Sequence, residues 1–304
     1  MNKRHIGMLD KSEFLILTEI EGSKVKHTQR SLSKKCNMSV GSVNKTINSL
    51  NEKKYLIDMA LTSDGVMALE PYRVKKAVFI AAGFGSRLAP ITLNTPKPLV
   101  RVNGTRMIET MLDAVTAVGI DEIYIVTGYL SEQFDVLLKK YPTIKLIENK
   151  RFNEGNNILS AALVCDKFSN AYILDGDIVL KNKNLITKYQ YSNNYLGIFK
   201  DKTDDWCLKT KKNNTIIDSI SVGGQNCYQW VGISYWDEES GRKLATDIPF
   251  VIDMPGGKER YWDQVALEYC KKNYVVNVRP CNECDVMEID SFAELKAIDK
   301  SYAI

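Results

Sequence analysis

Two glycines and two basic residues near the end of the first third of the chain could bind phosphate groups. A short apolar run at residues 77–82 has the length and composition of a buried strand, and Gly83 and Gly85 follow it directly. A strand that runs into a glycine turn directs successive backbone N–H groups into a concavity, which is a common way to hold phosphates. Arg87 and Lys97 add two positive charges. The stretch therefore predicts a cradle for a nucleoside triphosphate.

The glycine motif differs from the two most familiar nucleotide-binding motifs. Leu88 stands where a dinucleotide-binding fingerprint would have its third glycine, and no Gly-Lys-Ser or Gly-Lys-Thr follows, as a P-loop would require. We expect Ala82 and Ser86 to belong to the cradle together with the glycines. The sequence therefore predicts a phosphate site that is neither a dinucleotide-binding fingerprint nor a P-loop.

The cradle begins a region in which strands and helices alternate, and this order predicts a parallel sheet wound by right-handed crossovers. Expected strands are 77–82, 122–127, 144–147 and 171–174, and expected helices are 107–118, 131–138 and 157–168. Gly119 ends the first helix. Ligands of such sheets bind at the carboxyl ends of the strands. Gly128 and Tyr129 follow the second strand, and Asn156 and Asn157 open the third helix, so we expect these four residues to contact the base or the ribose.

Two carboxylates follow the strand at 171–174. Asp175-Gly-Asp177 could be a simple turn, because Asp-Gly is a common turn sequence. Mg²⁺ prefers oxygen ligands, however, and often takes one or two carboxylates together with substrate phosphates. We therefore expect Asp177 to bind Mg²⁺ directly, and Asp175 to lie next to the metal site without being a ligand.

The second half of the chain places aromatic residues beside acids. Aromatic faces attract cations by about 0.5–2 kcal/mol each, and carboxylates add to that attraction. These clusters predict a box for a cationic amine, formed by Trp206, Tyr261, Trp262, Asp263 and Glu288. Trp236, in contrast, is expected to be core.

Residues 1–72 differ in character from the rest. Residues 1–76 hold 14 Lys and Arg against 8 Asp and Glu, whereas 77–304 holds 27 against 29. Apolar residues at helical spacing predict helices from Lys11, Thr28 and Ser39, followed by a strand at Tyr55 and a turn at Asp64-Gly65. This order resembles winged helix-turn-helix regulators of the MarR-like type. The resemblance implies that the third helix presents its polar side chains to DNA, namely Ser39, Ser42, Asn44, Lys45 and Asn48. A module for protein contacts is the alternative.

The bulk composition indicates two domains, at 1–72 and 73–304, because 304 residues exceed the usual size of a single core. The chain is 44% hydrophobic and 26% charged, and it has no apolar run of membrane-spanning length. No signal-peptide pattern opens it, so the sequence predicts a cytoplasmic protein without membrane insertion. It is compatible with a homo-oligomer.

The region 76–300 resembles bacterial CTP:phosphocholine cytidylyltransferases of the LicC type. The resemblance rests on these stretches, which stand in the family order: 81–88 with the glycine motif, 94–100 with Thr-Pro-Lys-Pro, 126–135, Asn156-Asn157, Asp175-Gly-Asp177, Tyr261-Trp-Asp263 and Glu288-Ile-Asp290. It implies a GT-A-like, Rossmann-like α/β fold with a mixed, mostly parallel sheet, and transfer of CMP from CTP with Mg²⁺. It also implies metal-binding roles for Asp177 and Asp290, and a phosphate contact for Lys97. Trp206, Tyr261, Asp263 and Glu288 would surround the amine.

The expected reaction is an in-line attack of a phosphate or phosphonate oxygen on the α-phosphorus of CTP, with pyrophosphate leaving. Phosphocholine is the expected acceptor and CDP-choline the expected product. 2-Aminoethylphosphonate or phosphoethanolamine is the alternative, because acids also bind a primary amine. An alternative from another class is a DNA-binding regulator that senses CTP or CDP-choline through a nucleotidyltransferase domain without catalytic activity.

Overall fold

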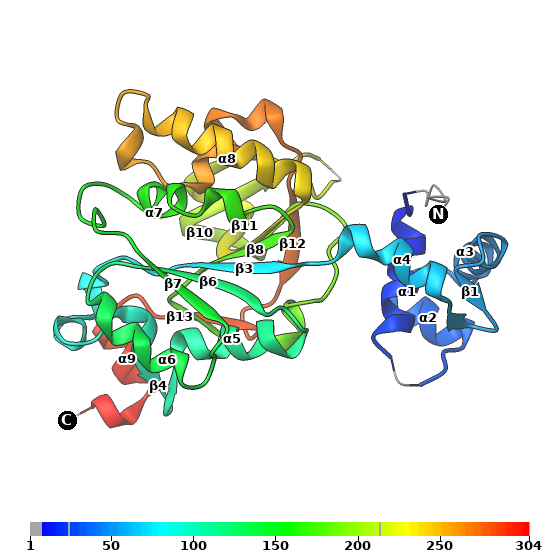
Figure 1. Cartoon of the computed structure of the whole chain (residues 1–304), viewed down its shortest axis with the longest axis horizontal. Helices are drawn as coiled ribbons and strands as arrows, with labels where there is room; N and C mark the ends of the chain where they lie inside the picture. The colour runs from blue at the N-terminus through cyan, green and yellow to red at the C-terminus, as the bar shows by residue number, and fades with distance from the viewer. Residues whose placement is uncertain (1–7, 24, 213, 304) are drawn as a thin grey trace. The chain divides into compact units, whose positions relative to one another are not determined.

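The computed structural model describes residues 8–23, 25–212 and 214–303. The chain forms two compact units (Figure 1). One holds the described residues up to Arg73 together with Tyr189–Tyr191, and the other holds 74–188 and 192–303. The segment 189–191 was not predicted from the sequence to belong to the N-terminal unit.

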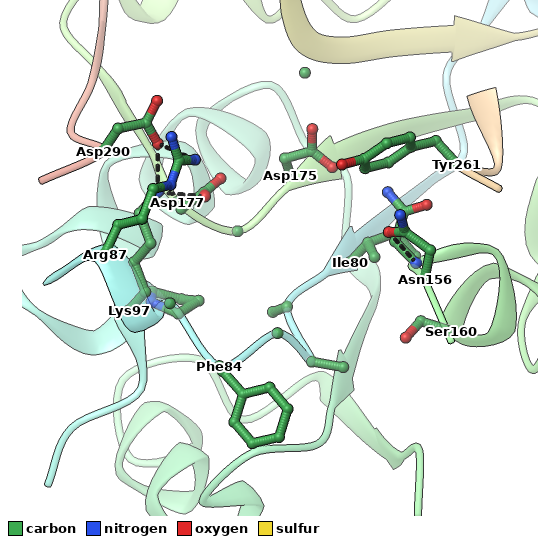
Figure 2. A pocket seen from close by; sticks show the side chains of 18 of the residues that line it. Ile80, Phe84, Arg87, Lys97, Asn156, Ser160, Asp175, Asp177, Tyr261 and Asp290 are labelled. Carbon is green, nitrogen blue, oxygen red and sulfur yellow. Dashed lines mark hydrogen bonds and ion pairs between the residues drawn. The ribbon is translucent and has the colours of Figure 1, made fainter. Parts of the chain in front are cut away.

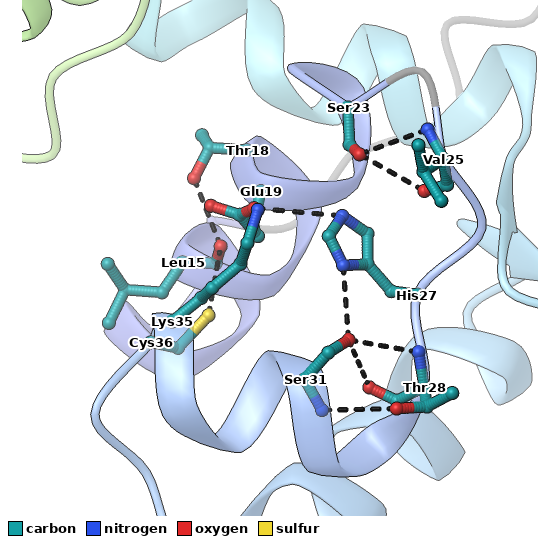
Figure 3. A network of polar contacts seen from close by, with 10 residues as sticks. All are labelled: Leu15, Thr18, Glu19, Ser23, Val25, His27, Thr28, Ser31, Lys35 and Cys36. Atoms are coloured by element: carbon teal, nitrogen blue, oxygen red, sulfur yellow. Dashed lines mark hydrogen bonds and ion pairs between the residues drawn. The ribbon is translucent and has the colours of Figure 1, made fainter.

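The N-terminal unit begins with three helices in the predicted order, and a short hairpin and a fourth helix follow them. The elements are α1 (Lys11–Glu21), α2 (Gln29–Lys35), α3 (Val40–Glu52), β1 (Leu56–Ile57), β2 (Ala60–Leu61) and α4 (Ser63–Leu69). Asp10, Thr28 and Ser39 cap the first three helices through their side chains. Glu19 of α1 pairs with Lys35 of α2 and lies 3.6 Å from His27 Nε2, which ties the two helices together (Figure 3).

The turn predicted at Asp64-Gly65 is wrong, because both residues lie inside α4. Thr62 Oγ1 accepts a hydrogen bond of 3.0 Å from the Gly65 N–H and starts the helix there. The hairpin turn lies earlier, at Asp58 and Met59, whose φ angles are +49° and +65°. A left-handed conformation at two successive residues matches a type I′ turn, which joins two short antiparallel strands.

The second unit is built on a sheet of seven strands in the order β12-β10-β11-β8-β3-β6-β7. Four of them, β3 (Lys76–Ile80), β6 (Glu122–Thr127), β7 (Ile144–Glu148) and β8 (Ala171–Asp175), run parallel to one another. The strand β11 (Ile217–Trp236) is antiparallel to both β8 and β10 (Asn194–Thr210), and β12 (Asn277–Cys281) is parallel to β10. The mixed, mostly parallel sheet is therefore confirmed. The long hairpin of β10 and β11 was not predicted, because its alternation is broken by register shifts.

Helices cover both faces of this sheet (Figure 1). On one face α5 (Met107–Ala117) and α6 (Asp135–Leu138) pack with the inward side chains of β3 and β6, in a core that includes Phe79, Ile108 and Leu112. On the other face α7 (Ile158–Ala162) and α8 (Glu238–Ile252) surround Trp236, Trp262 and Leu244. The helix predicted over 157–168 is shorter, and a 3₁₀ turn at Cys165–Lys167 follows it.

Two short strand pairs and a last helix also belong to the second unit. The strands β9 (Ile178–Leu180) and β13 (Val286–Glu288) pair antiparallel, and this pairing brings the chain around Glu288 next to the Asp175–Asp177 turn. The strands β4 (Arg101–Val102) and β5 (Thr105–Arg106) form a hairpin. The last helix, α9 (Phe292–Ile298), begins with the capping box predicted at Ser291 and Glu294. Within the part of the chain that the structure describes, no helix is long and apolar enough to cross a membrane.

Candidate active site

The glycine loop after β3 is locked to the segment that carries Lys97. Gly85 has a φ of +61°, a conformation that side chains rarely tolerate. A Cβ atom on Gly85 would lie 2.7 Å from Lys97 Cβ, so only glycine allows the two segments to approach this closely. Thr92 Oγ1 donates a hydrogen bond of 3.0 Å to the Gly85 carbonyl oxygen and fixes the loop from the other side.

Lys97 joins two carboxylates that lie far apart in the sequence. Its Nζ atom is 2.7 Å from Asp177 Oδ2 and 3.0 Å from Asp290 Oδ1, and Arg87 reaches the same Asp290 oxygen at 2.9 Å (Figure 2). Lys97 is only 6% exposed. Burial by itself would lower the pKa of Lys97, but the charges and hydrogen bonds of the two carboxylates outweigh burial and raise it. The ammonium group therefore stays charged at neutral pH.

A second group of acids lies deeper in the site. Asp175 ends β8, and a Cβ atom on Gly232 of the neighbouring strand would lie 2.0 Å from Asp175 Oδ2. Asp263 is buried and accepts a hydrogen bond of 2.7 Å from the Tyr195 hydroxyl. Desolvation raises the pKa of Asp175 well above its usual range, and the nearby charge of Asp263 raises it further. Desolvation also raises the pKa of Asp263 to about 7, against the lowering effect of the Tyr195 hydrogen bond.

Three aromatic rings form the far end of the site. The Trp206 ring contacts Trp230 and Tyr261 edge to face, with centroid distances of 6.1 and 5.9 Å. Asp205 and Glu288 line the same cleft as these rings. Desolvation raises the pKa of Glu288 to about 7, and the negative charges of Asp177 and Asp290 contribute to the increase. Rings and carboxylates together provide a setting that attracts a cation.

These groups line one cleft of about 940 Å³. The predicted residues that line it are Ala82, Gly83, Gly85, Ser86, Arg87, Lys97, Asn156, Asn157, Asp175, Asp177, Trp206, Tyr261, Asp263, Glu288 and Asp290. The fold therefore brings together the phosphate cradle, the acids and the aromatic end from segments up to about 200 residues apart. The cleft lies at the carboxyl ends of β3 and β8, as the alternation of strands and helices predicted.

Three predicted residues do not line the cleft. Trp262 is 2% exposed and packs in the core against Trp236 and Phe168, so it is not a wall of the amine box. Gly128 is buried behind the loop, where a Cβ atom would lie 2.8 Å from the Ala82 carbonyl oxygen. Tyr129 is half-buried and packs beside Phe84.

Asn156 and Asn157 are already partly engaged. The Asn156 amide group donates to the Glu259 carbonyl oxygen at 3.3 Å, and its oxygen accepts from the Asn157 N–H at 2.7 Å. The Asn157 side-chain oxygen accepts from the Trp262 N–H at 2.9 Å. Both residues therefore fix the chain before Trp262 and also face the cleft.

The cleft also contains residues for which the sequence suggested no role. They include Phe84, Phe152, Asn153, Ser160, Asp205, Val222, Trp230, Gly232 and Gln264. Trp230 and Asp205 belong to aromatic and acidic clusters that are visible in the sequence, but nothing local tells which members of a cluster face a ligand. Phe84 stands inside the glycine motif, and its position was the one available signal.

The acids fit a divalent cation only in part. Among the described residues, no group of three or more His, Cys, Asp or Glu is arranged to hold a metal ion by itself. Asp177 and Asp290 nevertheless converge on one point, the Lys97 ammonium nitrogen. Mg²⁺ commonly takes one or two carboxylates and completes its shell with water and substrate phosphates. Two carboxylates beside a phosphate cradle are therefore compatible with Mg²⁺.

Comparisons with known proteins define the class of this enzyme. The family model described as Nucleotidyl transferase matches residues 76–205, which include the glycine loop, Lys97 and both acids of the Asp175–Asp177 turn. The inositol-1-phosphate CTP transferase from T. maritima has a similar fold, with a TM-score of 0.58, 17% identity, and coverage of 76% of this chain and 94% of that one. The chain is a nucleotidyltransferase.

More similar proteins narrow this class. A 2-aminoethylphosphonate cytidylyltransferase of Lancefieldella rimae is 34% identical over 74% of this chain and 92% of its own length. A choline-phosphate cytidylyltransferase of Haemophilus influenzae is 34% identical over 71% of this chain and 92% of its own. The structure of CTP:phosphocholine cytidylyltransferase (LicC) from Streptococcus pneumoniae superposes with a TM-score of 0.69 and 30% identity, covering 75% of this chain and 99% of that one. The chain therefore belongs to the cytidylyltransferases of the choline-phosphate and 2-aminoethylphosphonate type.

Proposed function

We propose that this enzyme transfers CMP from CTP to phosphocholine in the presence of Mg²⁺, giving CDP-choline and pyrophosphate. The observation that carries the proposal is the combination, in one cleft, of a phosphate cradle with a box of three aromatic rings and carboxylates. Aromatic boxes are the usual way in which proteins recognise a quaternary ammonium group. The cleft thus offers one end to the triphosphate and the other to choline.

Catalysis on this proposal is charge neutralisation and positioning. The attacking phosphate oxygen is already anionic, so the site needs no strong general base. It must bring two anions together, and Lys97 and Arg87 supply fixed positive charge for that purpose. When bound, Mg²⁺ would be held by Asp177 and Asp290 and would neutralise developing charge on the phosphates.

The ion pairs of Lys97 give it a further role in the ligand-free enzyme. Its ammonium group neutralises part of the charge of Asp177 and Asp290 at distances of 2.7 and 3.0 Å. Without it, two carboxylates would face each other across a partly desolvated cleft, which is costly. Lys97 therefore balances part of the charge of both acids and orients them until the triphosphate provides new partners.

The alternative acceptor is 2-aminoethylphosphonate or phosphoethanolamine. It is favoured by the acids of the box, because a primary ammonium can donate hydrogen bonds to Asp263 and Glu288, which a quaternary ammonium cannot. The activity of the relative from Lancefieldella rimae points in the same direction. The membership in a family of enzymes weighs against the alternative of a sensor without catalytic activity.

Pyrophosphate release with CTP and Mg²⁺, measured for the three acceptors side by side, tests the proposal. We expect the highest kcat/KM with phosphocholine. A higher kcat/KM with 2-aminoethylphosphonate would show that this compound, and not phosphocholine, is the acceptor. No pyrophosphate release with any acceptor would refute the enzyme function.

Two variants separate the two kinds of amine recognition. Trp206→Leu should lower kcat/KM for a quaternary amine by about 2- to 30-fold, in line with roughly 0.5–2 kcal/mol per cation–π contact. Glu288→Gln should affect a primary amine more strongly. Phe199→Leu is a matched control, because Phe199 lies on the same strand β10 and does not line the cleft.

We also propose that the N-terminal unit is a winged helix-turn-helix domain that binds duplex DNA. The helix α3 buries Val43, Ile47 and Leu50 and leaves a row of polar side chains exposed, formed by Ser39, Ser42, Asn44, Lys45 and Asn48. Amide, hydroxyl and ammonium groups of this kind bind phosphates and base edges.

A gel shift on duplex DNA at several salt concentrations tests this second proposal. Binding should weaken as salt rises, and Lys45→Ala should weaken it and reduce the salt slope by about one. Lys11→Ala is the control, because it removes the same charge from α1. Absence of binding, or binding that does not respond to salt, would favour a role in protein contacts.

A further inference from the structure

Three aromatic rings meet at the lip of the cleft on the side of β6 and β7. Phe84 follows β3, Tyr129 follows β6 and Phe152 follows β7, so the rings come from three neighbouring strand ends. The centroid of Phe84 lies 5.3 Å from that of Tyr129 and 5.0 Å from that of Phe152. We call these three residues the aromatic ledge.

Phe84 is exposed for a residue of its type. Its relative exposure is 47%, and it lines the cleft together with Phe152. It stands within the glycine loop, directly after Gly83, whose Cβ position would meet no atom within 4 Å. In Figure 2 the Phe84 ring projects from this loop away from the side chains of Lys97 and Asp290. An exposed ring therefore adjoins the backbone that is expected to hold phosphates.

The rest of the ledge holds Phe84 in place. The Tyr129 N–H donates to the Ala82 carbonyl oxygen at 3.1 Å, and the Tyr129 hydroxyl donates to the Leu93 carbonyl oxygen at 3.2 Å. A Cβ atom on Gly128 would lie 2.7 Å from Phe152 Cβ, so the glycine lets the loops after β6 and β7 pack closely. Tyr129 and Phe152 are half-buried, and both are tilted against Phe84 at 47° and 58°.

A nucleoside triphosphate has two parts with opposite needs. Its phosphates require the positive charge of Lys97 and Arg87, and its base requires a flat apolar surface. In the other aromatic group of the cleft, Trp206 directly follows Asp205, and Tyr261 stands two residues before Asp263. Both acids also line the cleft, and their charge would repel a triphosphate and suit the acceptor amine. The aromatic ledge consists of three uncharged rings, and one of them, Phe84, stands within the glycine loop.

We propose that Phe84 stacks on the pyrimidine base of the nucleotide, and that Tyr129 and Phe152 position its ring. This inference rests on the proposed transfer from CTP and adds the residue that contacts the base. Phe84 is thereby a binding residue, and Tyr129, which sequence reasoning placed near the base, is a positioning residue.

The test compares CTP with inorganic tripolyphosphate, which has the same phosphate chain and no base. Equilibrium binding of both ligands is measured by calorimetry with Mg²⁺, for the wild type, Phe84→Ala, Phe84→Tyr and the control Phe199→Ala, which removes an exposed ring outside the cleft. Phe84→Ala should weaken CTP binding by about 5- to 150-fold, since stacking on one base contributes roughly 1–3 kcal/mol. It should leave tripolyphosphate binding within twofold of the wild type. Phe84→Tyr should bind CTP about as tightly as the wild type, and Phe199→Ala should change the binding of neither ligand.

Two results would overturn the base contact. An equal loss of CTP and tripolyphosphate binding in Phe84→Ala would mean that the ring only shapes the phosphate loop, and unchanged CTP binding would mean that the ring does not touch the base. The binding assay contains no acceptor, so it tests the base contact independently of the reaction. If the wild type binds CTP but releases no pyrophosphate when an acceptor is added in the activity assay, the proposed reaction is refuted and the base contact stands. Absence of CTP binding by the wild type would overturn both.

Discussion

Replacing Asp263 by asparagine should stabilise the enzyme at alkaline pH. Asp263 is buried, and desolvation raises its pKa to about 7 from the ordinary value of 3.8. The Tyr195 hydroxyl, at 2.7 Å, can donate equally to the side-chain oxygen of an asparagine. Asp263→Asn therefore keeps the shape and the hydrogen bond of the site and removes the ability to ionise.

The sign and the size of the effect follow from linkage. Between pH 3.8 and about 7 the unfolded chain has already released the Asp263 proton, whereas the folded protein still holds it. Stability contributed by this group therefore falls as pH rises through that window, by about 1.4 kcal/mol per pH unit, and reaches its lowest level above pH 7. The full difference is on the order of 4 kcal/mol. This is an upper limit, because the site relaxes and admits water, and because the neighbouring Asp175 ionises more readily once residue 263 carries no charge.

Urea unfolding at pH 5, 6, 7 and 8 measures the effect. The free energy of unfolding of Asp263→Asn should exceed that of the wild type by a margin that grows by about 3 kcal/mol at most from pH 5 to 7 and then stays level. The exposed Asp201 provides the control, since Asp201→Asn should show no such trend. Two results would refute the assignment of a desolvated carboxylate. One is a difference in free energy of unfolding between Asp263→Asn and the wild type that does not change with pH. The other is a wild type that is more stable than Asp263→Asn at pH 8.

The same substitution should impair function, because the charge that destabilises the fold is the charge that attracts the acceptor amine. At pH 8 a saturating acceptor should stabilise the wild type against urea more than it stabilises Asp263→Asn. Equal stabilisation of both proteins by the acceptor would place the amine away from Asp263.

Three further outcomes are expected. The KM for the acceptor should fall as pH rises through about 7, because the Glu288 carboxylate ionises there and attracts the cation, and Glu288→Gln measured at saturating CTP should flatten that profile. Gly232→Ala should lower the free energy of unfolding by about 1–3 kcal/mol, because its Cβ would lie 2.0 Å from Asp175 Oδ2, and the loss should shrink in a double variant with Asp175→Ala. Lys97→Met should lower kcat/KM for CTP by about 10²- to 10³-fold, the usual cost of one group that stabilises transition-state charge, whereas Arg87→Met should cost less, because the Arg87 side chain is 72% exposed and screened by water. A larger loss in Arg87→Met would reverse the order of the two cations.

Much of the fold of the second unit could be predicted from the sequence, because its signals are local. Apolar runs of strand length, helical spacing of apolar residues and glycine at helix ends located β3, β6, β7 and β8 and the helix α5 with few errors. The rule that ligands bind at the carboxyl ends of parallel strands then placed Gly83 and Asp177 on one edge of the sheet. The long hairpin of β10 and β11 escaped prediction because its strands shift register several times.

The same local signals failed where tertiary contacts decide between two readings. Asp64-Gly65 reads as a turn, yet the Thr62 hydroxyl starts a helix at that point. Trp262 stands next to Asp263 in the sequence, but consecutive side chains need not face the same way, and the tryptophan entered the core while the aspartate faced the cleft.

The sequence alone determined the types of chemical group in this protein: a glycine loop with two cations, acids at strand ends, aromatic residues near acids, and a basic N-terminal segment. Only the tertiary structure decided which of these groups meet. Lys97 contacts Asp177 and Asp290 across separations of 80 and 193 residues, and Gly232 makes room for Asp175 from a neighbouring strand. Such meetings depend on the pairing of β13 with β9 and of β11 with β8, and pairing between strands distant in sequence is set by the packing of the whole sheet and not by the residues of one segment.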